Sequence, residues 1–305
     1  MKLDRIILAS DLNANYIQFW PLVSRVWLHV TGARPTLFFV APPDTPIEKI
    51  DGCDIIFVPP PPDLPPCFVA QTIRLLAPSW FPDDVCVVSD IDLMVVKPHF
   101  FPSHLARYNT EQMVILNRYT PQVSRPSLSY HVAQGKFWAR LFTVATGPKE
   151  WPAVFNILRQ WHLQYAGQWA TDEIILHDHV SAVQKKEPKS IVQIFTPHLW
   201  YKPYYSVTHW YRNFGMDDTK LFQYIEVEPP GPYLQHKHSI HIILQKLLPR
   251  FDLKSIEVLQ PGIARPNRHP IKKMGGVKLP VQAHPMRVVR KLRTRRPIKL
   301  FKKQQ

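Results

Sequence analysis

The sequence predicts an α/β fold with a mostly parallel central sheet flanked by helices. Within the first 90 residues, short apolar runs rich in β-branched side chains alternate with segments whose apolar residues recur at helical spacing. This order of strand, helix, strand, strand, helix and strand is typical of a sheet with mostly parallel strands. Hydrophobic residues make up 45% of the 305 residues, which is enough for a sizeable core.

The first part of the chain supplies four expected strands and two expected helices. Residues 16–30 carry apolar side chains at helical spacing, and Gly32 follows them as a helix stop. A shorter helix is expected at residues 69–76. The strands are expected at residues 6–9, 36–40, 55–58 and 85–88.

The later part of the chain has a more mixed pattern. We expect a strand at residues 113–116, an amphipathic helix at 151–165 and a second helix that opens at Asp172. Residues 238–248 form an apolar stretch that fits either a strand or a helix.

The formal charge of +15 belongs to the end of the chain. Fourteen of the 38 Lys and Arg lie in residues 265–305, which hold no Asp or Glu, so 24 basic residues face 23 acidic ones in the rest. We therefore expect a folded domain at residues 1–263 and a basic, Pro-rich, disordered tail at residues 264–305. The nearly neutral domain argues against a fold that itself reads nucleic acid.

The cysteines and the apolar runs bear on the compartment. Cys53, Cys67 and Cys86 are scattered and form no CxxC pair, so we expect buried or free thiols in a reducing cytosol. The apolar run near the N-terminus is too short for a signal peptide, and no stretch approaches the ~18–20 apolar residues that span a bilayer. We expect a cytoplasmic protein, which the basic tail would hold at the periphery of membranes if it binds them.

Asp90 and Asp92 form the most informative motif. They follow the buried apolar run Val85–Val88 at the point where it stops. On an extended chain, residues i and i+2 point to the same side, so the two carboxylates would converge on one cation. Carboxylate oxygens suit Mg²⁺ or Mn²⁺, which keep coordination positions open for substrate phosphates. We therefore expect a metal site for a phosphorylated donor.

Two other interpretations of this motif stay open. An Asp-x-Asp pair also occurs as an ordinary strand end or turn. The motif also resembles that of polymerase-β-type nucleotidyltransferases, which place a Gly-Ser pair upstream and let the carboxylates begin a strand. Here the upstream segment Leu76–Asp84 has no Gly, and the strand leads into the carboxylates.

Four separated segments together resemble GT-A-fold glycosyltransferases that use an Asp-x-Asp motif and a nucleotide sugar. The resemblance covers most of residues 5–250 and is greatest to the small soluble glycosyltransferase domains of large algal viruses, the chloroviruses. It implies transfer of a hexosyl or deoxyhexosyl group from a nucleotide-diphosphate sugar, bound with Mn²⁺ or Mg²⁺, to a glycan hydroxyl. The segments are residues 9–13 with the aromatic positions after them, 71–78, 133–138 and 169–173.

The resemblance also implies roles for single residues in binding the donor and the metal. Arg74 would pair with Asp90 or touch the donor, since Arg suits planar bidentate contacts. Asp90 would face ribose or metal, and Asp92 would bind the metal directly. A His near the end of the domain often supplies a further ligand. The residues that would meet the nucleotide are Ala9, Asp11 and Asn13, although Asp11 could instead cap the next helix. The candidates for the His ligand are His236, His238 and His241, of which His241 is favoured.

Transfer with inversion needs a general base near the acceptor hydroxyl. Asp172 resembles the family's carboxylate at a helix N-terminus, where the helix dipole favours the charged form. Glu173 is the substitute if the register differs by one, and in a retaining enzyme Asp172 would orient the donor sugar instead. Gly135 would permit close backbone approach to the sugar. An aromatic cluster would either stack on the acceptor or pack in the core: Trp200, Tyr201, Tyr204, Tyr205, Trp210 and Tyr211.

The basic tail keeps three interpretations. It is an unstructured solubilising end, it binds an anionic membrane surface at about 1 kcal/mol per basic residue, or it binds nucleic acid. In a rival interpretation of the whole chain, the tail carries the function of a binding module and the catalytic fold is degenerate.

Overall fold

The computed structural model describes the greater part of the predicted domain. All structural statements below concern these residues only: 1–117, 128, 130–165, 170–195, 226–227, 229, 232–253 and 256. They belong to one compact unit, Met1–Ala264. The predicted disorder of residues 264–305 and the predicted aromatic cluster at residues 200–211 lie outside the described residues.

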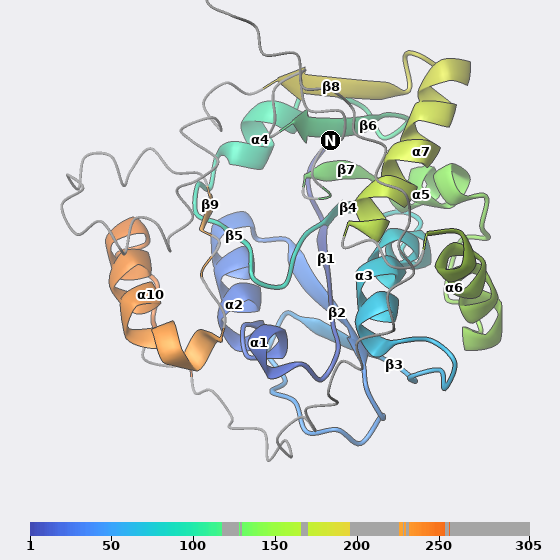
Figure 1. Ribbon diagram of the computed structural model, residues 1–305. Coiled ribbons are helices and arrows are strands. Elements are labelled where there is room, and N and C mark those ends of the chain that lie inside the picture. Colours follow the sequence, from blue (N-terminus) through green and yellow to red (C-terminus); the bar gives the residue numbers. More distant parts are fainter. Residues whose placement is uncertain are drawn as a thin grey trace, which may run out of the picture. The chain divides into compact units, whose positions relative to one another are not determined.

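A seven-stranded sheet forms the centre of the fold, in the order β3-β2-β1-β4-β7-β6-β8 (Figure 1). Only β7 runs against its neighbours in this sheet, since every other strand pair of the described residues is parallel. The mostly parallel α/β sheet predicted from the sequence is thus confirmed. The strands are β1 Arg5–Ser10, β2 Arg34–Val40, β3 Asp54–Val58, β4 Val85–Val88, β6 Met113–Asn117, β7 His131–Gln134 and β8 Ile191–Phe195.

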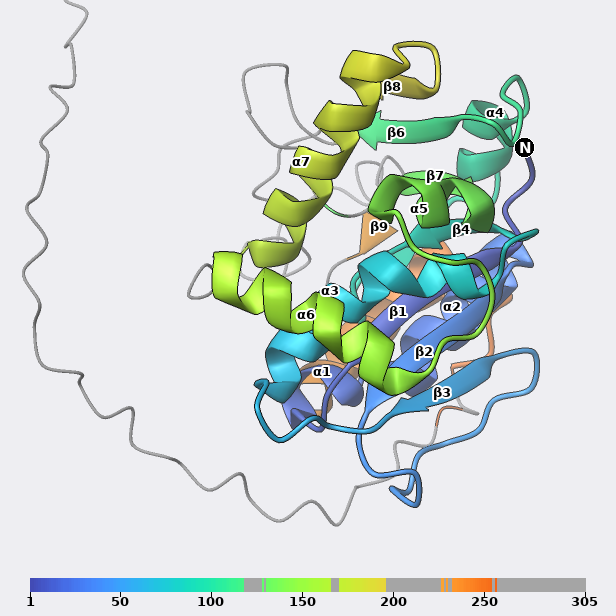
Figure 2. The same cartoon turned by 90° about the vertical axis from the view of Figure 1, so that its right-hand side faces the viewer.

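Helices cover both faces of this sheet and create two apolar layers. One layer joins the sheet to α1 (Ala14–Ile17), α2 (Trp20–Thr31), α4 (Phe100–Leu105) and α10 (Tyr233–Leu247). The other joins it to α3 (Pro66–Leu76), α5 (Gly135–Phe142), α6 (Trp151–Tyr165) and α7 (Thr171–Lys186). Figure 2 shows this second group of helices in front of the strands. Because both faces are covered, strands such as β1 are buried along their whole length, as parallel strands usually are.

Local chemistry explains where the helices begin and end. The helix expected over residues 16–30 is divided into α1 and α2, and Pro21 stands in the first turn of α2, where its missing N–H costs no hydrogen bond. Gly32 ends α2 with a φ of 69°, as the sequence predicted. The stretch at residues 238–248, left open between strand and helix, belongs to α10 up to Leu247, and Leu248 is the C-cap. Every described helix is too short or too polar to cross a bilayer.

The order of the strands creates a switch point between β1 and β4. From β1 the chain passes through α2 to β2 and β3 on one side, and α3 then carries it back to β4 on the other side of β1. The connections that follow the carboxyl ends of β1 and β4 therefore diverge. In open α/β sheets, ligands bind in the crevice at such a point.

Gly135 opens α5 at a place where two backbones meet. A Cβ at this position would lie 2.1 Å from the carbonyl oxygen of Phe81 and 2.5 Å from that of Pro78. Both carbonyls belong to the segment around the short 3₁₀ helix η1 (Ala77–Trp80). Only a residue without a side chain allows α5 to pack this closely.

We predict that Gly135→Ala destabilises the fold by about 3 kcal/mol, because backbone must shift to admit the methyl group. The matched control is Gly147→Ala, where a Cβ would meet nothing within 4 Å and only the φ of +86° causes strain. Urea unfolding of both variants measures the free energies. An equal or larger loss for Gly147→Ala would contradict the packing argument.

Candidate functional site

Three carboxylates lie at the switch point, at the carboxyl ends of two neighbouring strands. Asp11 directly follows β1, and Asp90 and Asp92 follow β4, whose parallel pairing with β1 continues to the amide of Ser89. Burial raises the pKa of the Tyr16 phenol, and the charges of all three carboxylates raise it further. We call Asp11, Tyr16, Asp90 and Asp92 the acidic edge.

The Asp-x-Asp segment forms a turn, and the prediction of an extended chain was wrong. The amide of Leu93 donates to the carbonyl of Asp90 at 3.2 Å, which closes the turn. Ile91 and Leu93 are 5% and 0% exposed, so buried apolar side chains alternate along the chain with the two carboxylates. Trp27 of α2 donates its indole N–H to the Leu93 carbonyl at 2.9 Å and fixes the end of the turn. The side chains of Asp90 and Asp92 therefore leave a turn and not the side of a strand.

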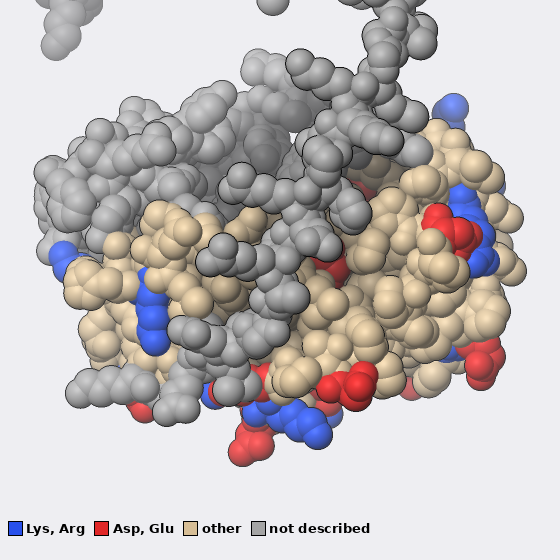
Figure 3. Space-filling model, turned by 60° about the horizontal axis from the view of Figure 1, so that its bottom comes forward, with Lys and Arg blue, Asp and Glu red and all other residues tan. Residues whose placement is uncertain are grey.

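Figure 3 looks onto the side of the molecule at which β1 ends. A few red acidic side chains are visible near the middle of this face, beside uncharged surface. The Asp90 side chain keeps 36% of its surface exposed. Asp11, Tyr16 and Asp92 are likewise neither fully buried nor fully exposed.

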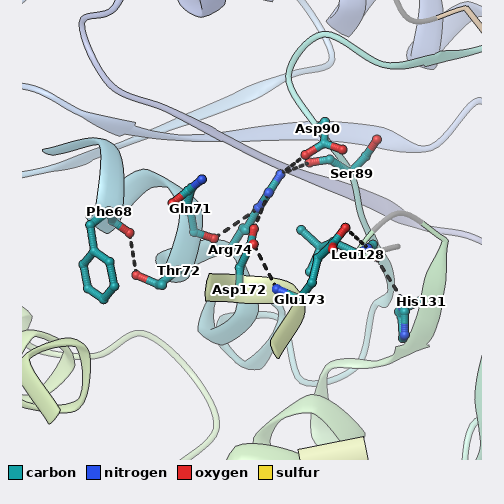
Figure 4. Close-up of polar contacts among 10 residues, drawn as sticks. All are labelled: Phe68, Gln71, Thr72, Arg74, Ser89, Asp90, Leu128, His131, Asp172 and Glu173. Carbon is teal, nitrogen blue, oxygen red and sulfur yellow. Dashed lines mark hydrogen bonds and ion pairs between the residues drawn. The ribbon is translucent and has the colours of Figure 1, made fainter. Parts of the chain in front are cut away.

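Arg74 of α3 connects this edge to α7. Its guanidinium forms ion pairs with Asp90 through Nη1 and with Asp172 through Nη2 (Figure 4). It also donates to the carbonyls of Ser89 at 3.3 Å and Gln71 at 3.1 Å. Burial alone would lower the pKa of Arg74, but the two carboxylates outweigh burial and raise the pKa. The predicted pairing with Asp90 is confirmed, whereas the sequence analysis missed the pairing with Asp172.

Asp172 lies in the first turn of α7, at the helix N-terminus where the sequence placed it. The residue is 2% exposed. Its Oδ2 pairs with Arg74, and its Oδ1 accepts the amide N–H of Glu173 at 2.9 Å. Both oxygens are therefore engaged inside the protein, in a geometry that suits a counter-ion.

Glu173 follows Asp172 and is only partly buried. Its Oε1 accepts the amide N–H of Leu128 at 3.4 Å. Burial raises the pKa of the Glu173 carboxyl, and the charges of Asp172 and Asp90 raise it further. This carboxyl therefore keeps its proton to a higher pH than an ordinary glutamate does.

The loop after β1 is ordered by its own side chains. The Oδ1 of Asp11 accepts the amide N–H of Asn13, and the Oδ1 of Asn13 accepts that of Asn15, both at 3.0 Å. Asn13, rather than Asp11, is therefore the N-cap of α1. Ala9 lies inside β1 with its side chain in the core, so the loop beyond β1 offers most of the surface for a ligand.

His241 lies on α10. Its Nε2 shares a hydrogen bond of 2.7 Å with the hydroxyl of Tyr233, and burial lowers the pKa of the imidazole. In the ranges that the structure describes, no three His, Cys, Asp or Glu side chains are grouped closely enough to hold a metal ion. The structure therefore does not assemble Asp90 and Asp92 with His241, nor with His236 or His238. The three cysteines are free, as expected.

Gly135 requires a correction. The antiparallel pairing of β4 with β7 sets Val88 opposite His131 and Val85 opposite Gln134. Gly135 follows Gln134, so it lies at the end of β4 that is remote from Asp90. The close approach that this glycine permits is to the backbone near η1, and its predicted contact with a donor sugar is wrong.

Comparisons with known proteins were made for the whole chain. No protein family matches it, and no curated protein does. Solved structures of similar fold include the glycosyltransferase GlyE of Streptococcus pneumoniae TIGR4, at 11% identity and a TM-score of 0.39 over 70% of this chain and 49% of GlyE. The chain thus spans about half the length of GlyE.

Two structures of the galactosyltransferase LgtC are also similar in fold. One, in complex with donor and acceptor sugar analogues, has 14% identity and a TM-score of 0.41 over 75% of this chain and 87% of LgtC. The other, an active-site mutant of LgtC, has 13% identity and a TM-score of 0.43 over 75% and 88%. These values are too low to transfer the role of any residue to this chain.

We predict that Arg74→Met lowers the free energy of unfolding by about 3–5 kcal/mol, because the buried Asp172 carboxylate loses its counter-ion. The double variant Arg74→Met/Asp172→Asn should lose less than the single variant does, since the uncompensated charge is gone. Urea unfolding of the parent, both single variants and the double variant measures the coupling.

Arg159→Met is the control for this cycle, because Arg159 forms an exposed ion pair with Asp63. It should have a much smaller effect on unfolding, as exposed pairs contribute little. Simple additivity of the Arg74 and Asp172 substitutions would show that the buried pair does not couple them.

Proposed function

We propose that this protein is a glycosyltransferase that moves a sugar from a nucleotide-diphosphate sugar to a hydroxyl of a glycan acceptor. The observation that carries the proposal is the acidic edge at the switch point, joined through Arg74 to the first turn of α7. A switch point is where an α/β sheet binds nucleotides. Carboxylates are the protein ligands through which a hard cation, and with it a diphosphate, is held.

The loop after β1 would receive the nucleotide. Asp11 and Asn13 carry carboxylate and amide groups on an ordered loop, and such groups can accept from a base N–H or a ribose hydroxyl. At the end of β4, Asp90 is paired with Arg74, and we propose that it faces ribose or the metal. Tyr16 supplies a ring and a hydroxyl whose pKa the same carboxylates raise after burial, the larger cause.

A divalent cation fits the chemistry of this edge in part. Asp90 and Asp92 are oxygen donors of the kind that Mg²⁺ and Mn²⁺ prefer. One oxygen of Asp90 is paired with Arg74, and the resemblance to GT-A-fold enzymes implies that Asp92 binds the metal directly. Phosphate oxygens of the donor would supply further ligands, whereas the predicted ligand His241 is not grouped with Asp90 and Asp92 in the described part of the chain. When bound, the cation supplies positive charge against the diphosphate that leaves.

Transfer with inversion, which we propose, requires a carboxylate that accepts the proton of the acceptor hydroxyl. Two carboxylates in the first turn of α7, Asp172 and Glu173, are the candidates. The partners predicted for the basic tail, an anionic membrane surface or nucleic acid, stay predictions, as do the binding-module and nucleotidyltransferase alternatives.

We predict that the parent releases nucleoside diphosphate from at least one sugar in a panel of UDP- and GDP-sugars when Mn²⁺ or Mg²⁺ is present. Asp92→Asn should reduce this release about 100-fold, because the carboxylate that would hold the cation is removed. Release of nucleoside diphosphate is followed by a coupled assay or by chromatography.

Asp63→Asn is the matched control, since it removes an exposed carboxylate that pairs with Arg159. This variant should retain the parent's rate. Equal rates for Asp92→Asn and the parent would remove Asp92 from the proposed site. A parent that releases no nucleoside diphosphate from any donor, with either metal, would overturn the proposed function.

A further inference from the structure

The N-terminus of α7 carries two adjacent carboxylates with different surroundings. Figure 4 shows Arg74 between Asp90 and Asp172, with Glu173 alongside. Arg74 pairs with Asp90 and Asp172, and within the described residues Glu173 forms no ion pair with it. The two neighbours on α7 are therefore suited to different tasks.

We infer that Glu173, and not Asp172, accepts the proton of the acceptor hydroxyl, while Asp172 is the buried counter-ion that positions Arg74 and, through it, Asp90. The inference rests on the proposed function and names the proton acceptor of that site.

Asp172 is poorly placed to take a proton from a substrate. A general base must come within hydrogen-bond reach of the proton that it accepts. Asp172 is 2% exposed, and each of its oxygens already has a partner. Protonation would also neutralise the counter-ion of a buried guanidinium, which breaks a buried ion pair.

Glu173 has the access that Asp172 lacks. Its side chain is only partly buried, and a single contact, from the Leu128 amide to Oε1, orients it. In the part of the chain that the structure describes, no partner contacts Oε2. Figure 4 shows its side chain beside the group formed by Arg74, Asp90 and Asp172. Oε1 thus has one long backbone contact, and Oε2 can meet an acceptor hydroxyl.

The surroundings of Glu173 also suit a base. Burial and the neighbouring carboxylates raise the pKa of this carboxyl, while the charge of Arg74 partly opposes them. A base is most effective when its pKa lies close to the working pH, so this shift strengthens the acceptor. On the elements packed against it, the charged groups that act on Glu173 are Asp90, Asp172 and Arg74.

In the transfer step, the acceptor oxygen forms a bond to the anomeric carbon of the donor as the bond from that carbon to the diphosphate oxygen breaks. The bonding pair leaves with the nucleoside diphosphate. The proton of the acceptor hydroxyl moves to the carboxylate of Glu173, which returns it to solvent afterwards.

The test compares Glu173→Gln with Asp172→Asn in the full chain, using the donor that the parent hydrolyses best. Gln at 173 keeps an oxygen that can accept from the Leu128 amide, so folding should be retained. We expect kcat to fall about 10²–10⁴-fold in Glu173→Gln, with binding of the nucleoside diphosphate changed less than about twofold. In the parent, kcat/KM should fall on the acid side at a higher pH than an ordinary glutamate would cause. We call this fall of kcat/KM at low pH the acid limb, and Glu173→Gln should lack it.

Asp172→Asn should behave differently. It should weaken nucleoside diphosphate binding and lower stability, yet its residual activity should keep the acid limb of the parent. Glu173→Asp, which retains a shorter carboxylate, should recover part of the rate and the limb. The inference is overturned if Glu173→Gln keeps the parent's rate and limb, or if Asp172→Asn alone loses the limb. A parent inactive with every donor is instead the failure of the proposed function.

A measurement without substrate checks the environment of Glu173. A carboxyl whose pKa is raised by folding stabilises the native state below its unfolded pKa of about 4.3, and this contribution is lost as pH rises through the folded value. Glu173→Gln should therefore be more stable than the parent at pH 7, and the difference should shrink towards pH 4. A difference that is independent of pH would contradict the environment on which the inference depends.

Discussion

The buried guanidinium of Arg74 is the interaction on which the arrangement of the site depends. It joins α3, the turn after β4 and the first turn of α7, which are distant in sequence. Removing a charge from water is costly unless it is paired and hydrogen-bonded, and Arg74 meets both conditions with two carboxylates and two carbonyls. Because a guanidinium is planar with donors in a fixed fork, its two partners are held in a fixed mutual orientation.

The pairing with Arg74 leaves Asp90 and Asp172 with different exposure to solvent, although both carboxylates contact the same guanidinium. Asp172 is enclosed with Arg74, whereas Asp90 keeps part of its side chain in solvent. The charge of Asp172 in turn acts on Glu173, whose carboxyl lies outside the pair. The Arg74 guanidinium thus makes Asp172 a buried counter-ion, whereas Asp90 and Glu173 can still contact a ligand.

The fold could be predicted from the sequence to a large extent, because its strands and helices have strong periodic signals. The helix expected at residues 151–165 has those bounds in the structure, and the strand at residues 85–88 does too. Gly32 was also recognisable, since a glycine after an amphipathic helix is a common stop. Such signals are local, because the residues that create them lie close to one another in the sequence.

The site was less predictable, since it depends on contacts between distant segments. The pairing of Arg74 with Asp172 spans 98 positions and leaves no periodic trace. The extended Asp-x-Asp was wrong because the Leu93 amide closes a turn onto the Asp90 carbonyl and Trp27, 66 positions away, binds the end of that turn; such a contact is not visible in a five-residue motif. Gly135 was misplaced for a similar reason, because the direction of β7 decides which edge it occupies.

The turn that carries Asp90 and Asp92 is tethered from both sides of the sheet. Trp27 reaches it from the layer of α2, and Arg74 reaches it from the layer of α3. A loop fixed in this way loses its conformational freedom when the chain folds, so little remains to be lost when a ligand binds. The carboxylates would then act as a rigid receptor, and selectivity among cations and donors would come from size and charge rather than from adaptation of the loop.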